Sequence, residues 1–488
     1  MLTTLKYGEI KNFVGGKLVD HGGEYLDIMN PNDGSIIGKV ALSTSKDLDI
    51  AVEAAKKAFP AWSNTTIKDR AQVFYRYKNL IEQNLEELAT IVHEENGKTM
   101  PEARASIAKG IELTEFACSM PQLIGGEILE VSRGVECRID RFPLGVVASI
   151  LPFNFPFMVP NWTVPNALVL GNCMVLKPSR YVPISALKIA ELLKEAGLPD
   201  GVLNIVNGGR EIVTGICNHK DIEAVSFVGS TKVAEIVYKS VTSNLKRAVC
   251  LGSAKNHLIV LPDAHDEMTA KDVAASMTGC AGQRCMAATV MVAVGEVDHI
   301  IEKLCNEARN IIPGKNMGAI INKEAKDEII HFINQAEKEG GKVVVDGRNV
   351  TVPGKENGLY VGPTIIDNVT PDMTIAQEEV FGPVLSIIRV KNVDEAIKIE
   401  NNNRYGNASS VYTQSGGSAN YVIERVSAGM CGVNIGVPVP REPFSFGGWN
   451  DSKYGIEDIT GRSSIEFWTK PKKRTTKWNP EDKCGWMS

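Results

Sequence analysis

Short apolar runs alternate with helical patterns through the middle of the chain, and this alternation limits the folds that the sequence can adopt. The apolar runs lack polar alternation, as strands buried on both faces do. They cover residues 145–151, 173–176, 203–206 and 224–228. Helical periodicity separates them near residues 186–196 and 212–219. Because crossover helices join parallel strands, the pattern predicts an α/β fold with a doubly wound parallel sheet, which binds its ligand beyond the carboxyl ends of the strands.

A second α/β region is expected from about residue 258 to about residue 434. It begins with an apolar run at 258–261 and contains a β-branched run at 289–294. Helices are predicted at 298–312 and 323–339, and strands at 342–345 and 384–390. The length of 488 residues is enough for two or three domains.

The remaining segments carry weaker patterns. A helix is predicted at 46–62 with Ser45 as its cap, and further helices are predicted within 68–118. Charged and apolar residues alternate at 125–142, which indicates exposed strands, and segment 444–453 is expected to be a loop. No Gly-x-Gly-x-x-Gly sequence is present, so these patterns alone indicate only an α/β region large enough for a cofactor.

Composition argues against several classes of function. The net charge of −5 is small for this length, so no nucleic acid or anionic membrane is expected as a partner. The basic run at 470–474 is expected to be a solvated turn. The ten cysteines are scattered, without Cys-x-x-Cys pairs or zinc-ligand spacing, so no metal site is expected.

The cysteines and the N-terminus also predict a location. Scattered thiols fit a reducing compartment. The N-terminal residues lead into polar sequence without the apolar core of a signal peptide, and no apolar run is long enough to span a bilayer. We therefore expect a cytoplasmic protein without membrane partners.

The stretch 279–287 contains the most reactive group that the sequence suggests. Cys285 lies among small residues, just before the predicted buried strand, where a rigid scaffold could hold a thiol within reach of a substrate. Arg284 adds a neighbouring cation, which favours thiolate over thiol. The alternative is an inert, packed cysteine, since free cysteine is among the most buried residue types. Cys280 is the rival thiol and is interpreted as a small packing residue.

The sequence Gly-Gln-Arg-Cys at 282–285 resembles the cysteine motif of the aldehyde dehydrogenase superfamily. Further stretches agree in order and approximate spacing, and they lie at 151–156, 176–179, 227–230 and 379–384. The resemblance extends from about Phe13 to about Pro471. Within the superfamily, the stretches 284–287 and 254–257 resemble the methylmalonate-semialdehyde dehydrogenase branch, whose members transfer the acyl group to coenzyme A.

The resemblance implies an aldehyde dehydrogenase-like α/β fold with two doubly wound domains and a small β oligomerisation arm. Residues 1–124 and 143–255 would form a discontinuous cofactor-binding domain, and residues 256–445 the catalytic domain. Residues 125–142 and 463–488 would form the arm and tail, and the protein would be a homodimer or homotetramer.

The resemblance also assigns the reacting groups. Cys285 would attack the aldehyde and form a thioester. The Asn154 amide and the backbone N–H of Cys285 would hold the oxyanion, because preorganised donors stabilise that charge. A small-molecule aldehyde is thus the expected substrate.

A nicotinamide dinucleotide is the implied hydride acceptor, with NAD expected and NADP possible. The implied cofactor-binding residues are Phe153, Lys177, Ser179, Arg180, Gly229, Ser230, Glu379 and Phe381. At position 180 the family has a glutamate that grips the ribose hydroxyls and repels a 2′-phosphate. Arg180 would instead tolerate or favour a 2′-phosphate, or would point to solvent.

Cys250 marks the departure that matters most for the reaction. Hydrolytic members of the superfamily have a glutamate at this position, which activates the deacylating water. Without that base, water attacks the thioester poorly, whereas the thiol of coenzyme A ionises far more readily. The sequence therefore predicts acyl transfer to coenzyme A. A hydrolytic enzyme that uses another base and releases the free acid is the alternative.

The substrate is expected to be a small acidic semialdehyde, methylmalonate or malonate semialdehyde. In the resembled branch arginines bind the substrate carboxylate, and Arg284 matches one of them. Lys109 occupies the place of the other, which keeps the charge but loses the bidentate fork. Arg104, about one turn away, could compensate. A different small anionic aldehyde, such as a sulfonated one, stays open. A catalytically inactive structural subunit is a third hypothesis, which the retained site residues oppose.

Overall fold

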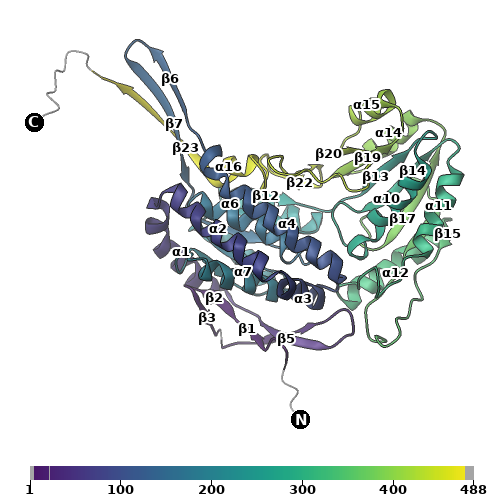
Figure 1. Cartoon of the computed structure of the whole chain (residues 1–488), viewed down its shortest axis with the longest axis horizontal. Helices are drawn as coiled ribbons and strands as arrows, with labels where there is room; N and C mark the ends of the chain where they lie inside the picture. Colours follow the sequence, from purple (N-terminus) through teal and green to yellow (C-terminus); the bar gives the residue numbers. More distant parts are fainter. Residues whose placement is uncertain (1–4, 21, 479–488) are drawn as a thin grey trace, which may run out of the picture.

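The computed structural model describes residues 5–20 and 22–478. Two large sheets with their helices form the body of the molecule, and a three-stranded arm projects from one end (Figure 1). A small sheet near the N-terminus contains β1 (Glu9–Ile10), β5 (Ile36–Ala41) and β4 (Tyr25–Met29). This architecture confirms the predicted α/β fold with two sheets and a β arm.

The first sheet has the strand order β22-β12-β11-β8-β9-β10-β2-β3. Its parallel centre consists of β8 (Val146–Ile150), β9 (Cys173–Lys177), β10 (Leu203–Ile205), β11 (Ile222–Val228) and β12 (Arg247–Leu251). Antiparallel strands at its two edges are β2 (Asn12–Val14), β3 (Lys17–Val19) and β22 (Lys453–Tyr454). All residues of β8 and β9 are buried, as their continuous apolar character predicts.

Helices pack along the first sheet and share one large hydrophobic core with it. They are α1 (Ser45–Asn64), α2 (Ile67–Gln83), α3 (Leu85–Asn96), α4 (Met100–Cys118), α5 (Met120–Leu123), α6 (Met158–Val169), α7 (Ile184–Glu195), α8 (Arg210–Asn218) and α9 (Thr231–Ser243). The prediction of Ser45 as a cap is wrong by one residue. Thr44 is the cap, because the carboxylate of Asp47 accepts from both its N–H and its hydroxyl.

The second sheet has the strand order β15-β16-β17-β14-β13-β19-β20. Its strands are β13 (Asn256–Val260), β14 (Ala288–Val294), β15 (Lys342–Val345), β16 (Thr364–Asp367), β17 (Val384–Val390), β19 (Ala408–Tyr412) and β20 (Met430–Val433). All pairs are parallel except β15 with β16. The helical segments of this region are α10 (Asp266–Thr278), η1 (Gly279–Gly282), α11 (Asp298–Arg309), α12 (Lys323–Lys338), α13 (Thr374–Gln377), α14 (Val393–Asn402) and α15 (Gly416–Ile423).

Both faces of the second sheet are covered. Along β14, Val290 and Val292 belong to one hydrophobic cluster, whereas Met291 and Ala293 belong to another. Successive side chains of a strand point to opposite faces. The two clusters are therefore the cores on the two sides of a doubly wound sheet, which explains why residues 289–294 show no polar alternation.

The arm is a sheet of β6 (Glu127–Ser132), β7 (Val135–Pro143) and β23 (Thr469–Lys477). The exposed strands predicted at 125–142 are thus present. The basic run at 470–474 lies within β23 and pairs with β7, so the prediction of a solvated turn is wrong. Helix α16 (Ser463–Trp468) leads into β23. The end of the predicted tail, residues 479–488, lies outside the described residues.

Segment 444–453 is a loop interrupted by short strands, which the sequence did not indicate. Strand β21 (Trp449–Asn450) pairs with β18 (Tyr405–Gly406), and β22 pairs with the edge of the first sheet. Two-residue strands carry no periodicity, so pairing with distant partners alone creates them. In the part of the chain that the structure describes, no helix has the length and apolar character needed to cross a bilayer.

The fully buried Asn172 joins three segments that are distant in sequence. Its Oδ1 accepts from the N–H groups of Leu144 and Gly145, at 2.8 and 3.2 Å. Its Nδ2 donates to the carbonyls of Ala167 and Trp468, at 3.0 and 2.9 Å. One amide thus ties the end of α6 and the end of α16 to the start of β8.

Replacing Asn172 with alanine is expected to lower the free energy of unfolding by about 3 kcal/mol, because the backbone groups it serves would lose their partners in the interior. Chemical denaturation of the two proteins measures the difference. The exposed Asn402 is the control, and its alanine variant should stay within about 0.5 kcal/mol of the wild type. Equal stabilities of the three proteins would contradict the role of Asn172.

Candidate active site

Cys285 opens into a cavity of about 980 Å³ that residues of both sheet regions line. The cavity is large enough for a ligand well beyond the size of a small aldehyde. It brings together ten of the residues predicted from the sequence, which are Phe153, Asn154, Lys177, Ser179, Arg180, Gly229, Ser230, Cys285, Glu379 and Phe381.

The topology of the first sheet explains why these residues meet. Lys177 is the last residue of β9 and lies beside Ile150, the last residue of β8. Phe153 and Asn154 follow β8, and Gly229 follows β11, which is the other neighbour of β8. Parallel neighbours end at the same edge, so the segments that follow them converge there.

The loop before Cys285 has an unusual backbone. Cys280 and Ala281 in η1 have φ of 54° and 53°, in the left-handed region that costs non-glycine residues roughly 1–3 kcal/mol each. Two contacts hold this turn. The Glu102 carboxylate accepts from the Cys280 N–H at 2.6 Å, and the Gln283 side chain donates to the Cys280 carbonyl at 3.3 Å. The sequence indicated neither of these roles for Glu102 and Gln283, because a contact between distant segments leaves no local sequence pattern.

Gly282 cannot be another residue in this fold. Its φ is 71°, and an added Cβ would lie 2.0 Å from the carbonyl oxygen of Gly382. Phe381, next to Gly382, also has a positive φ of 54°. The segments 282–285 and 379–384, which the sequence showed as separate motifs, therefore touch through their backbones.

The Cys285 carbonyl is fixed by two asparagine side chains. Asn256 and Asn407 each donate to it at 2.8 Å, and Asn256 also donates to the Ala287 carbonyl at 2.9 Å. Asn256 lay within a quoted motif, but nothing in the sequence singled out Asn407. Together they anchor the backbone on which the thiol is carried.

Asn154 lies beside the same loop. Its Nδ2 donates to the Gln283 carbonyl at 3.1 Å, and its side chain is almost buried. The buried Lys98 donates through Nζ to the Asn154 carbonyl and, at 2.8 Å, to Asn96 Oδ1. The Asn154 amide is thus held rigidly at the cavity wall, as a donor to an oxyanion must be.

Burial dominates the ionisation of Cys285. Burial first, and the Glu379 carboxylate second, raise the pKa of the thiol to about 12. The expectation that Arg284 favours the thiolate is right in direction, since this cation lowers the pKa, but burial outweighs it. The guanidinium of Arg284 turns away, donating to the Ala275 and Ser276 carbonyls at 2.9 and 2.7 Å.

Cys280 is buried, as its interpretation as a packing residue predicts. Its thiol has Lys98 as a hydrogen-bonding neighbour, and burial nevertheless raises its pKa. Cys280 does not line the cavity, whereas Cys285 does. The structure therefore separates the two thiols by access.

Glu379 and Cys250 occupy contrasting places. Glu379 lines the cavity and accepts from the Ala254 N–H at 2.8 Å, and burial raises the pKa of its carboxyl group. Cys250 lies fully buried in β12 as part of the large core. Burial raises the pKa of the Cys250 thiol, so this side chain offers no base to the cavity.

The predicted substrate-binding cations have partners within the protein, which are carboxylates for Lys109 and Arg104 and backbone carbonyls for Arg284. Lys109 Nζ lies 3.0 Å from a carboxylate oxygen of Glu112 and 2.9 Å from one of Glu442. Arg104, the expected compensating residue, pairs with Glu86 on α3 at 2.8 Å. Lys109, Arg104 and Arg284 are not among the residues that line the 980 Å³ cavity. The structure thus does not gather them with the other predicted site residues.

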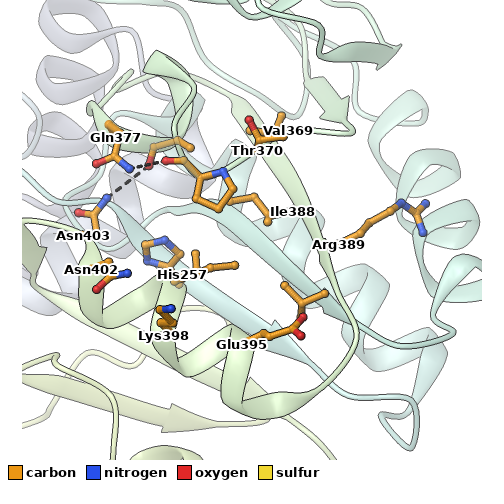
Figure 2. A pocket seen from close by; sticks show the side chains of 14 residues that line it. His257, Val369, Thr370, Gln377, Ile388, Arg389, Glu395, Lys398, Asn402 and Asn403 are labelled. Carbon is orange, nitrogen blue, oxygen red and sulfur yellow. Dashed lines mark hydrogen bonds between the residues drawn. The ribbon is translucent and has the colours of Figure 1, made fainter.

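A second cavity, of about 420 Å³, lies in the second sheet region beside α14 (Figure 2). Figure 2 shows the ring of His257 there, near Asn402 and Lys398. Burial and Lys255 lower the pKa of His257 to about 3, so its ring is neutral. Within the described ranges, no cluster of three or more His, Cys, Asp or Glu residues could hold a metal ion. Cys285 is absent from this cavity, which therefore is not the candidate active site.

Alkylation of Cys285 by iodoacetamide should be slow at neutral pH. Its rate should rise about tenfold per unit from about pH 7 to about pH 10, because the thiolate reacts and the pKa is raised. Mass spectrometry of the Cys285 peptide follows the reaction. Glu379→Gln should speed alkylation at each pH, because it removes a neighbouring negative charge. A plateau below about pH 9 would show that the thiol is not held in this way.

Comparisons with known proteins agree over almost the whole chain. The model of the aldehyde dehydrogenase family matches residues 18–473. Malonate-semialdehyde dehydrogenase 2 from Bacillus thuringiensis (strain Al Hakam) is 45% identical over 478 residues, which cover 96% of this chain and 98% of that protein. The malonate-semialdehyde dehydrogenase of Halalkalibacterium halodurans is 43% identical, covering 98% of this chain and 100% of that protein.

Solved structures give the same result. A protein from Sinorhizobium meliloti 1021, described as a methylmalonate-semialdehyde dehydrogenase and complexed with NAD, has a TM-score of 0.95 at 42% identity, covering 96% of this chain and 98% of that chain. Methylmalonate-semialdehyde dehydrogenase from Oceanimonas doudoroffii has a TM-score of 0.95 at 41% identity, covering 97% and 99%. The resemblance drawn from the motifs is confirmed, and the chain belongs to the aldehyde dehydrogenase family.

Proposed function

We propose that this protein oxidises malonate or methylmalonate semialdehyde with a nicotinamide dinucleotide and releases the acyl group to coenzyme A. The observation that carries the proposal is the opening of Cys285 into a cavity beside the Asn154 amide. Relatives that are 41–45% identical along the chain and named for these two semialdehydes support the choice of substrate.

In the proposed reaction, Cys285 Sγ attacks the aldehyde carbon, and the Asn154 amide and the Cys285 N–H stabilise the oxyanion. NAD, when bound, supplies the hydride acceptor. Its positively charged ring would also lower the thiol pKa that burial raises. Phe153 and Phe381, whose rings lie 5.8 Å apart edge to face, would flank the nicotinamide end of the cavity. Gly229 and Ser230 precede α9, whose N-terminal N–H groups suit a pyrophosphate.

Acyl transfer to coenzyme A follows from the place of Cys250. This residue stands where hydrolytic relatives have their base, and it is buried in the core without access to the thioester. The thiol of coenzyme A then has the advantage over an unactivated water. The alternative, hydrolysis to the free acid, would need a carboxylate at the cavity to act as the base. Glu378 and Glu379 both line the cavity, where Glu378 accepts from the Tyr405 hydroxyl and Glu379 from the Ala254 N–H.

The arm supports a proposal for assembly. Its strand β6 is exposed throughout, including the apolar residues Ile128, Leu129 and Val131. Apolar side chains on a projecting edge strand are suited to cover by another copy. We propose a homodimer or homotetramer in the cytoplasm, with residues 1–124 and 143–255 as the cofactor-binding domain, 256–445 as the catalytic domain, and 125–142 with 463–488 as arm and tail.

NADH or NADPH formation from malonate and methylmalonate semialdehydes, with and without coenzyme A, tests the proposal. Turnover should rise about tenfold or more with coenzyme A, because a thiol deacylates the enzyme faster than water does. Mass spectrometry should detect an acyl-CoA product. Cys285→Ala should lose about a thousandfold or more, whereas Cys280→Ala should stay active. Equal turnover without coenzyme A, giving free acid, would refute acyl transfer and favour the hydrolytic alternative.

Lys109 and Glu442 allow a paired test of substrate recognition. Lys109→Ala should raise the KM for the acidic aldehyde about threefold or more, with less effect on propanal, because it removes a partly exposed cation. Glu442→Gln should lower the KM for the acidic aldehyde, because it removes one of the two carboxylates, Glu442 and Glu112, that compete for Lys109. Steady-state kinetics with both aldehydes measures this. Equal changes for both aldehydes would remove Lys109 from substrate recognition.

A further inference from the structure

Among the described residues, the large cavity is lined by cations without carboxylate partners. One is Lys232 on α9, and a group of three comes from strands β9 and β10 and the segments after them. Lys177, Arg180 and Arg210 all belong to its wall. Across residues 5–20 and 22–478, no aspartate or glutamate forms an ion pair with any of the three. Most other arginines at the surface are paired, for example Arg348 with Asp346 and Glu337. Unpaired cations gathered on a cavity wall indicate an anionic ligand.

The strand pairing places the three cations together. Strands β9 and β10 are parallel neighbours with Leu176 opposite Ile205, and the Val206 N–H donates to the Leu176 carbonyl at 3.0 Å. Lys177 is the last residue of β9, and the segment after it carries Arg180. The segment after β10 leads to Arg210, the first residue of α8. Both segments leave the sheet side by side at the same edge.

Lys177 is the buried member of this group. Its side chain is 7% exposed, and its Nζ donates to the Pro178 carbonyl at 3.1 Å. Burial and the neighbouring Arg180 lower its pKa to about 8. A nearly buried ammonium group without a counter-charge is costly, and a ligand that supplies negative charge would offset that cost.

Arg180 and Arg210 supply the outer part. Arg180 donates to the Tyr181 hydroxyl at 3.0 Å, and its guanidinium lies 5.1 Å from the Tyr181 ring, which limits its movement. Helix α8 begins after Gly209, and no side chain caps it. Its first N–H groups therefore lack a side-chain acceptor and could donate to an anion. Guanidinium groups bind phosphate in a bidentate manner, with a geometry that ammonium groups lack.

The carboxylates of the cavity lie elsewhere. They are Glu235, Glu328, Glu378 and Glu379. Glu235 pairs with Lys239 on α9, and the other three come from the second sheet region. The segments after β9 and β10 therefore bring no carboxylate to the cavity wall. An NAD site usually has a carboxylate that binds the ribose 2′-hydroxyl. An NADP site usually has an arginine that binds the 2′-phosphate.

We propose that Lys177, Arg180 and Arg210 form a receptor for the 2′-phosphate of the adenosine ribose, so that the protein binds NADP in preference to NAD. This inference rests on the proposed function, since it concerns the dinucleotide of the same cavity. It names Arg210 as a specificity-determining residue for the cofactor. The apolar Val213 on α8 and Val233 on α9 also line the cavity and would accept the adenine ring.

Calorimetric titration of the full-length protein with adenosine 2′,5′-bisphosphate and with 5′-AMP isolates the contribution of the 2′-phosphate without requiring turnover. The bisphosphate should bind about tenfold or more tightly, because each charge-assisted contact of this kind is worth at least that factor. NADP and NAD, titrated in the same way, should differ in the same direction. Equal or weaker binding of the phosphorylated ligands would overturn the inference.

Variants assign the effect to residues. Arg180→Glu should weaken bisphosphate binding about a hundredfold, because it places a negative charge against the phosphate, while 5′-AMP binding is kept or tightened, because the carboxylate can accept from the ribose hydroxyls. Arg210→Ala should weaken bisphosphate binding about fivefold. Arg309→Glu on α11 makes the same charge change outside the cavity and should have no effect. Loss of affinity in this control as well would refute a local receptor.

The failure of this inference is distinguishable from the failure of the proposed function. Acyl-CoA formation with NAD, together with equal binding of the two adenosine ligands, would leave the proposed function standing and overturn the 2′-phosphate receptor. Tight bisphosphate binding without acyl-CoA formation from either semialdehyde would do the reverse.

Discussion

The backbone contact between Gly282 and Gly382 is the constraint on which the candidate active site depends. A methyl group at Gly282 would reach within 2.0 Å of the Gly382 carbonyl, so only glycine permits this approach. The contact sets the loop that carries Cys285 against the segment that carries Glu379 and Phe381. The left-handed turn at Cys280 and Ala281 completes the arrangement, and Glu102 and Gln283 supply the hydrogen bonds that offset its strain.

Burial governs the charges around this contact. It raises the pKa of Cys285 to about 12 and lowers that of Lys177 to about 8, so both groups are shifted toward their neutral forms. Burial is the largest cause of both shifts. A cationic ring beside the thiol and an anionic group beside the lysine would each offset these shifts. The cavity is thus complementary to a dinucleotide in charge as well as in size.

The sheet topology carries the positioning. Strands β8, β9, β10 and β11 are parallel neighbours, so segments separated by dozens of residues reach one edge and form one wall. Asn172 and the paired asparagines on the Cys285 carbonyl show the same principle at smaller scale. Single side chains there satisfy backbone groups from distant segments, and the pair at Cys285 anchors the loop that carries the thiol.

The sequence by itself determined the α/β class, four strands of each large sheet, the family and ten residues of the large cavity. Apolar periodicity and short motifs are local properties, and they survive without coordinates. Tertiary structure decided the ion pairs and the burial of charges, since these depend on residues distant in the chain. It placed Thr44 as a cap and the basic run in a strand, and it paired Lys109 with Glu442. It also let burial outweigh Arg284 at the thiol, and it placed Arg210 in the lining of the same cavity as Arg180, because only the tertiary fold sets the contacts and burial of each charge.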